Sequence, residues 1–161
     1  MKEIAVTRRI PVRYTVDVCV VGAGPAGIAA AVTAAGQGGK VLLIDSAAVP
    51  GGMSTAALVP VLMPCSDGVH FLPGGFGRKV LDRLQASAAA RNFKSGLSIN
   101  AEHLKRIYED LLTESGAEIL YYTRMCDAVV ESGRIGAVLC SAPSGSFAVE
   151  ASVYIDAVSY T

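Results

Sequence analysis

The sequence lacks tryptophan, contains two histidines, and carries no excess charge of either sign. Fourteen basic residues balance fourteen acidic ones, so no net field is available to attract nucleic acid or an anionic membrane. The four cysteines show no C-x-x-C spacing, which argues against a zinc site or a redox dithiol. We therefore expect no bound metal, no nucleic-acid partner, and reduced, buried thiols in a cytoplasmic protein.

Charged residues are also missing between Asp17 and Lys40, a gap long enough to suggest a membrane helix or a signal peptide. Glycines and a proline interrupt this stretch, however, and few apolar residues precede Gly22. Both alternatives therefore fit poorly, and we expect no membrane association.

Length and composition predict one folded domain. With 161 residues, 52% of them hydrophobic, the chain can bury a substantial core. The first thirteen residues lean basic, and we expect residues 1–13 to form a leader or an added edge strand. The domain itself is expected to run over residues 14–161.

A glycine-rich turn is the most informative motif. An apolar strand, Asp17–Val21, leads to Gly22, and glycines follow at positions 24 and 27 before a helix-favouring run over residues 28–35. In this spacing Gly22 permits a tight turn, Gly24 lets the backbone approach a pyrophosphate, and Gly27 lets the helix pack on the sheet. A second strand then ends in Asp45, where an acid would accept hydrogen bonds from an adenosine ribose. The pattern predicts dinucleotide binding; a βαβ unit without a ligand is the alternative.

Two helices and an irregular connection are expected downstream. Residues 56–73 are apolar but broken by prolines and Asp67-Gly68, which favours an irregular connection. A helix is predicted over residues 76–90. Asn100 is a suitable N-cap for another helix, which Gly116 would end.

Short strands complete the predicted fold. A buried strand is expected over residues 118–123, then three short strands over 126–131, 135–140 and 147–150, and a last strand over 153–155. This order predicts an α/β, Rossmann-like domain: a parallel sheet flanked by helices, with an antiparallel three-stranded β-meander in place of one crossover. An ordinary NAD-binding dehydrogenase domain would instead continue to alternate strands and helices.

Five segments carry a resemblance to a known family: residues 20–27, 42–45, 51–55, 74–78 and 154–157. Together they resemble FAD-dependent oxidoreductases of the two-dinucleotide-binding-domain type, which include glutathione reductase-like and succinate dehydrogenase-like flavoproteins. The likeness runs from about Tyr14 to Ala157. Many flavoproteins share the first segment, whereas the Gly-Gly-Met segment that begins at residue 51 and the later Gly-Gly-x-Gly at residues 74–77 together narrow the choice of family. It implies an FAD/NAD(P)-binding fold, FAD as cofactor, and flavin-mediated hydride or electron transfer with an unknown small-molecule substrate.

The same resemblance implies which residues meet the cofactor. The glycine turn would wrap the pyrophosphate, Asp45 with Ser46 would hold the adenosine ribose, and the loop at residue 52 would follow the flavin half. Met125 would contact adenine through its backbone, or Val129 if the register differs. The implied cofactor residues are Gly22, Gly24, Pro25, Ala26, Gly27, Asp45, Ser46, Gly52, Met53, Ser54, Met125 and Ala157.

The sequence departs from the family after Ala157. Similar proteins continue with Thr-Gly-Asp, whereas this chain reads Val-Ser-Tyr-Thr over residues 158–161. We expect an N-terminal fragment that lacks the substrate-binding region and works, if at all, with a complementing chain or as a homo-oligomer. A non-catalytic dinucleotide-binding fragment and an NAD(P)-linked dehydrogenase domain are the alternatives.

No catalytic acid or base can be identified from the sequence. Cys65 could face a flavin as a redox thiol, but it has no partner cysteine, and a buried structural thiol is favoured. Arg78 and Arg83 could meet a substrate anion, although a solvated helix face explains them equally well. His70 and His103 are expected at the surface.

Overall fold

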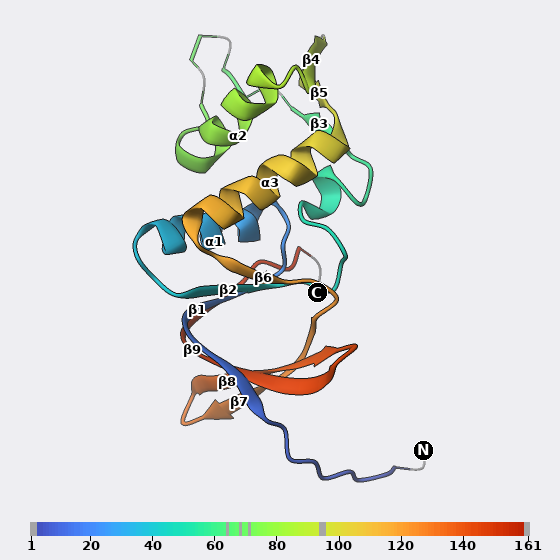
Figure 1. Ribbon diagram of the computed structural model, residues 1–161, viewed down its shortest axis with the longest axis vertical. Coiled ribbons are helices and arrows are strands. Elements are labelled where there is room, and N and C mark those ends of the chain that lie inside the picture. The colour runs from blue at the N-terminus through green and yellow to red at the C-terminus, as the bar shows by residue number, and fades with distance from the viewer. Residues whose placement is uncertain (1–2, 64, 68, 71, 94–95, 160–161) are drawn as a thin grey trace.

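The structure is a computed structural model that describes residues 3–159 except 64, 68, 71, 94 and 95 (Figure 1). Strands and helices alternate in the first part of the chain, and the last part consists of strands. They are β1 (Val12–Val21), α1 (Pro25–Gly36), β2 (Val41–Ile44), the short 3-10 helix η1 (Gly52–Ser54), β3 (Val61–Leu62), α2 (Gly75–Ala86), β4 (Ala90–Phe93), β5 (Gly96–Ile99), α3 (Ala101–Ser115), β6 (Glu118–Leu120), β7 (Arg124–Glu131), β8 (Arg134–Ala142) and β9 (Gly145–Asp156).

The main sheet has six strands in the order β6-β2-β1-β9-β8-β7. Strands β6, β2, β1 and β9 run parallel, and β7 and β8 join β9 as antiparallel neighbours. The α/β fold predicted from the sequence is therefore confirmed, with a parallel sheet, flanking helices and an antiparallel section.

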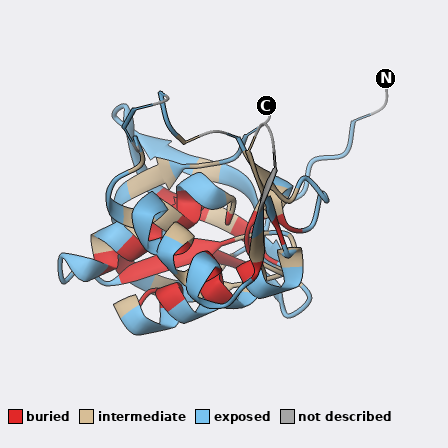
Figure 2. Cartoon of the chain, turned by 90° about the horizontal axis from the view of Figure 1, so that it is seen from above, coloured by how far each residue is buried: buried red, intermediate tan, exposed pale blue. Residues whose placement is uncertain are grey.

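Two hydrophobic cores lie on opposite faces of the central strands, because successive strand residues point to opposite sides. On one face Val20 and Leu43 pack with side chains of α1 and α3, including Ile28 and Leu104. On the other face Cys19, Leu42 and Ile44 pack with Val138 of β8 and Phe147 of β9. The antiparallel end of the sheet thus folds back beneath the central strands, on the side away from the helices (Figure 1). Figure 2 shows the buried residues on the inner sides of the helices and along the strands beneath them.

Strand β9 corrects one prediction. The expected third meander strand and final strand are a single strand that pairs with β8 over Gly145–Glu150 and with β1 as far as Asp156. Where β9 leaves β8, the Tyr154 hydroxyl replaces the backbone pairing between the two strands. It accepts a hydrogen bond from Ala151 N at 2.7 Å and donates one to the Gly136 carbonyl at 2.9 Å. The strand can therefore continue through Ala151 without its antiparallel neighbour.

A second sheet, β3-β5-β4, was also absent from the sequence-based prediction. Strand β3 lies inside the stretch expected to be irregular, and β4 begins at Ala90, where a helix was expected. Helix α2 ends earlier than predicted, and Ala88 has a left-handed backbone with φ of 52° that turns the chain into β4. Pro64, Gly68, Tyr160 and Thr161 lie outside the described residues.

Helix α3 follows the prediction at both ends. The Asn100 side chain accepts hydrogen bonds from the N–H groups of Glu102 and His103 at 3.0 and 3.2 Å, and Gly116 adopts the left-handed conformation with φ of 80°. The strand after it is shorter and more exposed than expected, since β6 stops at Leu120 and Glu118 is exposed. Strand β1 begins at Val12, ahead of the predicted Asp17. Among the described residues, none of the helices has the length and apolar character to cross a membrane.

Candidate functional site

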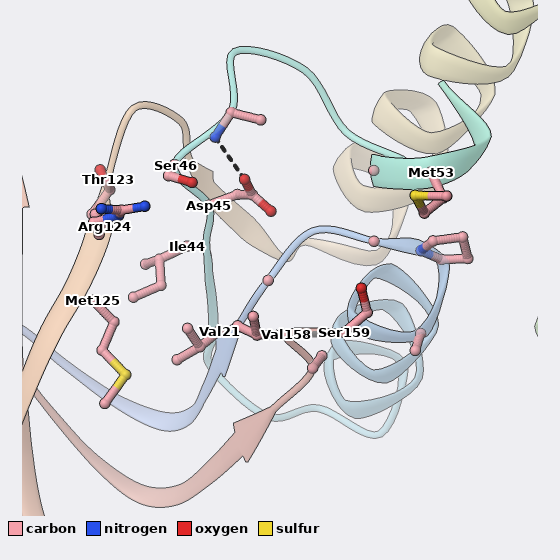
Figure 3. A pocket seen from close by; sticks show the side chains of 17 residues that line it. Val21, Ile44, Asp45, Ser46, Met53, Thr123, Arg124, Met125, Val158 and Ser159 are labelled. Carbon is pink, nitrogen blue, oxygen red and sulfur yellow. Dashed lines mark hydrogen bonds between the residues drawn. The ribbon is translucent and has the colours of Figure 1, made fainter. Parts of the chain in front are cut away.

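A cavity of about 470 Å³ opens at the carboxyl ends of β1 and β2, beside the chain that leaves β6 (Figure 3). The turn between β1 and α1 forms one part of its wall, and the loop after β2 forms another. In open parallel sheets this edge, where connections leave the strands, is the usual place for a ligand.

The glycine turn shows three different uses of glycine. Gly22 has φ of +100°, and its N–H donates to the Ile44 carbonyl at 2.8 Å. A Cβ on Gly27 would lie 1.8 Å from the Gly22 carbonyl oxygen, so this glycine lets α1 pack against the turn. Gly24 has an ordinary φ of −70°, and a Cβ built on it would meet nothing within 4 Å. At Gly24 the lack of a side chain therefore keeps space open rather than relieving strain.

The N-terminus of α1 begins at this open position. No side chain caps it, its first turn holds no acidic residue, and Pro25 occupies the start of the helix. The first N–H groups of a helix lack partners within the helix, and the helix dipole places partial positive charge there. An uncapped helix start beside a cavity suits a phosphate or another anion.

Asp45 connects the glycine turn to the loop after β2 through hydrogen bonds. One carboxylate oxygen accepts from Ala23 N in the glycine turn at 2.5 Å. The other accepts from Ala47 N at 2.6 Å, the bond dashed in Figure 3. Its backbone continues the parallel pairing, with Asp45 N bonded to the Leu120 carbonyl and Thr123 N to the Asp45 carbonyl. Each carboxylate oxygen can accept a further hydrogen bond, so Asp45 can position the turn and still meet a ligand hydroxyl.

The loop at residues 50–55 is held against the glycine turn. Gly51 N donates to the Ala23 carbonyl at 2.7 Å, and a Cβ on Gly52 would lie 3.3 Å from the Gly24 Cα. Met53 lines the cavity, while the Ser54 hydroxyl donates to the Gly51 carbonyl at 2.8 Å.

Tyr108 of α3 supports this loop from behind. Its ring stacks on Phe76 with centroids 6.2 Å apart, and a Cβ on Gly51 would lie 3.0 Å from its Cε2. Burial raises the pKa of Tyr108. Tyr108 therefore packs against the loop from the side of α3, while Ser54 holds the loop from within.

The structure brings together most of the residues implied by the family resemblance. All of them except Gly27 and Ser54 line the cavity. Gly27 supports the turn through its contact with Gly22, and Ser54 supports the loop. Met125 lines the cavity, whereas Val129 is not among the lining residues.

Sequence reasoning missed several lining residues. The last residues of β1 and β2 could have been found, because the carboxyl ends of adjacent parallel strands share one edge of a sheet. Arg124 was also missed, although it directly precedes Met125. Among the described lining residues, Asp45 and Arg124 are the ionisable ones. The missed residues are Val21, Ile44, Ala47, Thr123, Arg124, Val158 and Ser159.

The other residues singled out from the sequence lie away from the cavity. Arg78 pairs with Asp82 at 2.8 Å, and Arg83 pairs with Glu114 of α3. His70 and His103 are exposed, as predicted. Both arginines and both histidines therefore belong to surfaces outside the cavity wall.

The cysteines differ in burial. Cys19 and Cys140 are buried as expected, but Cys65 is half-buried and Cys126 is exposed. Burial, with a smaller contribution from a neighbouring thiol, raises the pKa of Cys19 to about 12 and that of Cys140 to about 11. Cys65 donates to the Met63 carbonyl at 3.3 Å and does not line the cavity. Within the described part of the chain, no three His, Cys, Asp or Glu residues are grouped to hold a metal ion.

This arrangement is that of a dinucleotide-binding domain, and the chain belongs to the FAD dependent oxidoreductase family, whose model matches residues 17–160. It is 36% identical over 137 residues to a ferredoxin–NADP reductase of Saccharopolyspora erythraea, covering 85% of this chain and 37% of that protein. A ferredoxin–NADP reductase of Salinispora tropica is 36% identical over 126 residues, covering 76% of this chain and 36% of that protein. The chain thus spans little more than a third of these relatives.

Solved structures share the fold at lower sequence identity. The crystal structure of THI4 from Thermovibrio ammonificans matches with a TM-score of 0.63 and 21% identity, covering 89% of this chain and 57% of that one. The open conformation of a flavocytochrome c3 fumarate reductase matches with a TM-score of 0.59 and 16% identity, covering 90% and 34%. These likenesses agree with the α/β architecture described above.

Proposed function

We propose that this chain binds FAD in the cavity at the carboxyl ends of β1 and β2. The observation that carries the proposal is Gly24, whose missing side chain leaves open space beside the uncapped start of α1. A pyrophosphate needs such close approach to backbone N–H groups, and a side chain there would keep it away. The membership of the chain in an FAD dependent oxidoreductase family supports FAD as the dinucleotide.

Successive groups of lining residues along the edge of the sheet would bind successive parts of FAD. The turn at Gly22 and Gly24 would hold the pyrophosphate. Asp45, with lone pairs left after its two backbone contacts, would accept from the ribose hydroxyls beside Ser46. Gly52 and Met53 would lie along the flavin half, on the loop that is bonded to the turn through Gly51.

We further propose that the chain is the FAD-binding part of an oxidoreductase. Bound FAD would supply the hydride or electron acceptor, because its ring system carries the redox chemistry. The chain's own residues would bind and orient it. The ferredoxin–NADP reductases that it resembles support an electron-transfer role, with substrate contacts contributed outside this chain.

The second candidate function is nucleotide binding without catalysis. The small number of ionisable side chains in the cavity favours it. The ionisable groups among the described lining residues are Asp45 and Arg124, and Met53, at the loop end of the cavity, offers no proton-transfer group. Turnover by this chain alone is therefore expected to be slight even when FAD is bound.

The test is a titration of the purified chain with FAD, FMN and NADP⁺ by calorimetry, with absorbance in the flavin bands recorded after dialysis. We expect FAD to bind, and FMN to bind at least about tenfold more weakly because it lacks the adenosine that the β2 side of the cavity would hold. A colourless protein that binds NADP⁺ more tightly than FAD would overturn the proposal. Bound FAD without reduction by any donor would favour the nucleotide-holding role.

A further inference from the structure

Arg124 occupies a position in the cavity that the family resemblance did not assign. It is the first residue of β7, and its side chain points toward Ile44 and Ser46 (Figure 3). The preceding residue fixes this position, because Thr123 N donates to the Asp45 carbonyl at 2.8 Å. Arg124 therefore lies beside the end of β2 even though β6 has already ended at Leu120.

The guanidinium of Arg124 has no carboxylate partner among the described residues. The four ion pairs found there involve other side chains, and none of them joins Arg124 to Asp45, the one acid among the described lining residues. Arg124 is exposed, and the same part of the cavity wall includes the apolar side chains of Ile44 and Met125. A planar cation that lines a cavity together with apolar side chains is suited to a flat aromatic ligand.

The order of strands along the sheet edge indicates which part of a dinucleotide lies there. The phosphate-binding turn follows β1, the ribose-binding acid follows β2, and Arg124 follows β6, the next strand outward. Neighbouring strands are about 4.8 Å apart, so the path from β1 to β6 crosses roughly 10 Å. That separation places Arg124 past the ribose, at the base, and away from the pyrophosphate.

We propose that Arg124 is a specificity residue for the adenine end of the ligand, with its guanidinium packed on the face of the purine ring. This inference rests on the proposed FAD site. The contact would make the adenosine half a source of affinity in its own right, so that adenine nucleotides without a flavin would also bind. The planar guanidinium, rather than its charge alone, would carry the effect, because guanidinium planes stack on bases whereas an ammonium group does not.

The experiment compares Arg124→Ala, Arg124→Lys and wild type by calorimetric titration with FAD, ADP and FMN. Arg134→Ala is the matched control, since it removes the same charge from an exposed residue of β8 that does not line the cavity. We expect Arg124→Ala to weaken FAD and ADP binding by about tenfold each, to leave FMN binding unchanged, and to melt like wild type. Arg124→Lys should recover less than half of this loss in binding free energy.

The outcomes separate the possible roles. The adenine assignment would be overturned if Arg124→Ala bound FAD like wild type, or if it lost FMN binding as much as FAD binding. Full recovery of FAD binding in Arg124→Lys would also overturn it, because charge alone would then be sufficient. A wild-type chain that binds none of the three probes would overturn the proposed FAD site itself. Loss of FAD binding in Arg134→Ala to the same extent would also overturn the assignment, because a general charge effect would then explain both variants.

Discussion

Substituting Gly24 by alanine should separate ligand binding from folding. Its φ of −70° and ψ of 175° are open to any residue, and an added Cβ meets nothing within 4 Å. Alanine lowers the entropy of the unfolded chain, worth about 0.4–1 kcal/mol, but is a poorer N-cap than glycine by a similar amount. The free energy of unfolding should therefore change by less than about 1 kcal/mol.

The same methyl group should be costly for the ligand. It would occupy the space where the backbone is expected to meet a pyrophosphate, and moving the phosphates outward would lose about two charge-assisted hydrogen bonds. Each such bond contributes about 1.5–3 kcal/mol, so the loss is at least about 3 kcal/mol. That corresponds to more than a hundredfold weaker FAD binding, measured by calorimetry alongside urea unfolding of the same preparation.

Two neighbouring glycines provide the controls. Gly36, at the exposed end of α1, also has open space at its Cβ, and Gly36→Ala should keep full FAD affinity. Gly27→Ala should instead cost about 3 kcal/mol of stability, because its Cβ would lie 1.8 Å from the Gly22 carbonyl oxygen and the backbone would have to shift. The reasoning is refuted if Gly24→Ala binds FAD like wild type, or if it unfolds as readily as Gly27→Ala.

Three further perturbations test other parts of the structure. Asp45→Asn should cost about 1–3 kcal/mol in urea unfolding, because an amide nitrogen would then face one of two backbone N–H groups; unchanged stability would contradict this. Asn100→Ala should lower thermal stability by about 1 kcal/mol through loss of the α3 cap, with less effect from Asn100→Asp. The free energy of unfolding should fall as the pH rises above about 9, because thiols ionise in the unfolded chain whereas burial raises the pKa of Cys19 to about 12 and that of Cys140 to about 11 in the folded one. Cys140→Ala should show a smaller loss of stability at alkaline pH.

Local patterns were sufficient to predict the glycine turn after β1 and the limits of α3. Gly22 has the left-handed φ of +100° expected of a tight turn, and Gly27 lies too close to the Gly22 carbonyl to carry a side chain, as its predicted packing role requires. The caps at Asn100 and Gly116 are likewise local signals. These features depend on backbone conformation and on hydrogen bonds over a few positions, which a sequence shows directly.

Features that depend on distant partners were not predicted. The continuity of β9 relies on the Tyr154 hydroxyl, which bridges to Gly136 of another strand. The small sheet is aligned by contacts such as Ile99 N to the Pro60 carbonyl at 2.8 Å. Arg124 becomes part of the site only because the chain leaving β6 stays beside Asp45. Each of these depends on tertiary pairing that local propensity does not show.

The pairing of β1 with β9 also has a kinetic consequence. One strand lies near the start of the chain and the other near the end of the described residues, and Ala157 N bonds to the Val21 carbonyl directly below the glycine turn. During synthesis the turn, α1 and β2 emerge first, yet Gly22 cannot pack against Ala157 until residue 157 has been made. Long-range pairings of this kind are slow steps in folding. The floor of the cavity should therefore close only after β9 has docked on β1, and the proposed FAD site would be complete only from that step on.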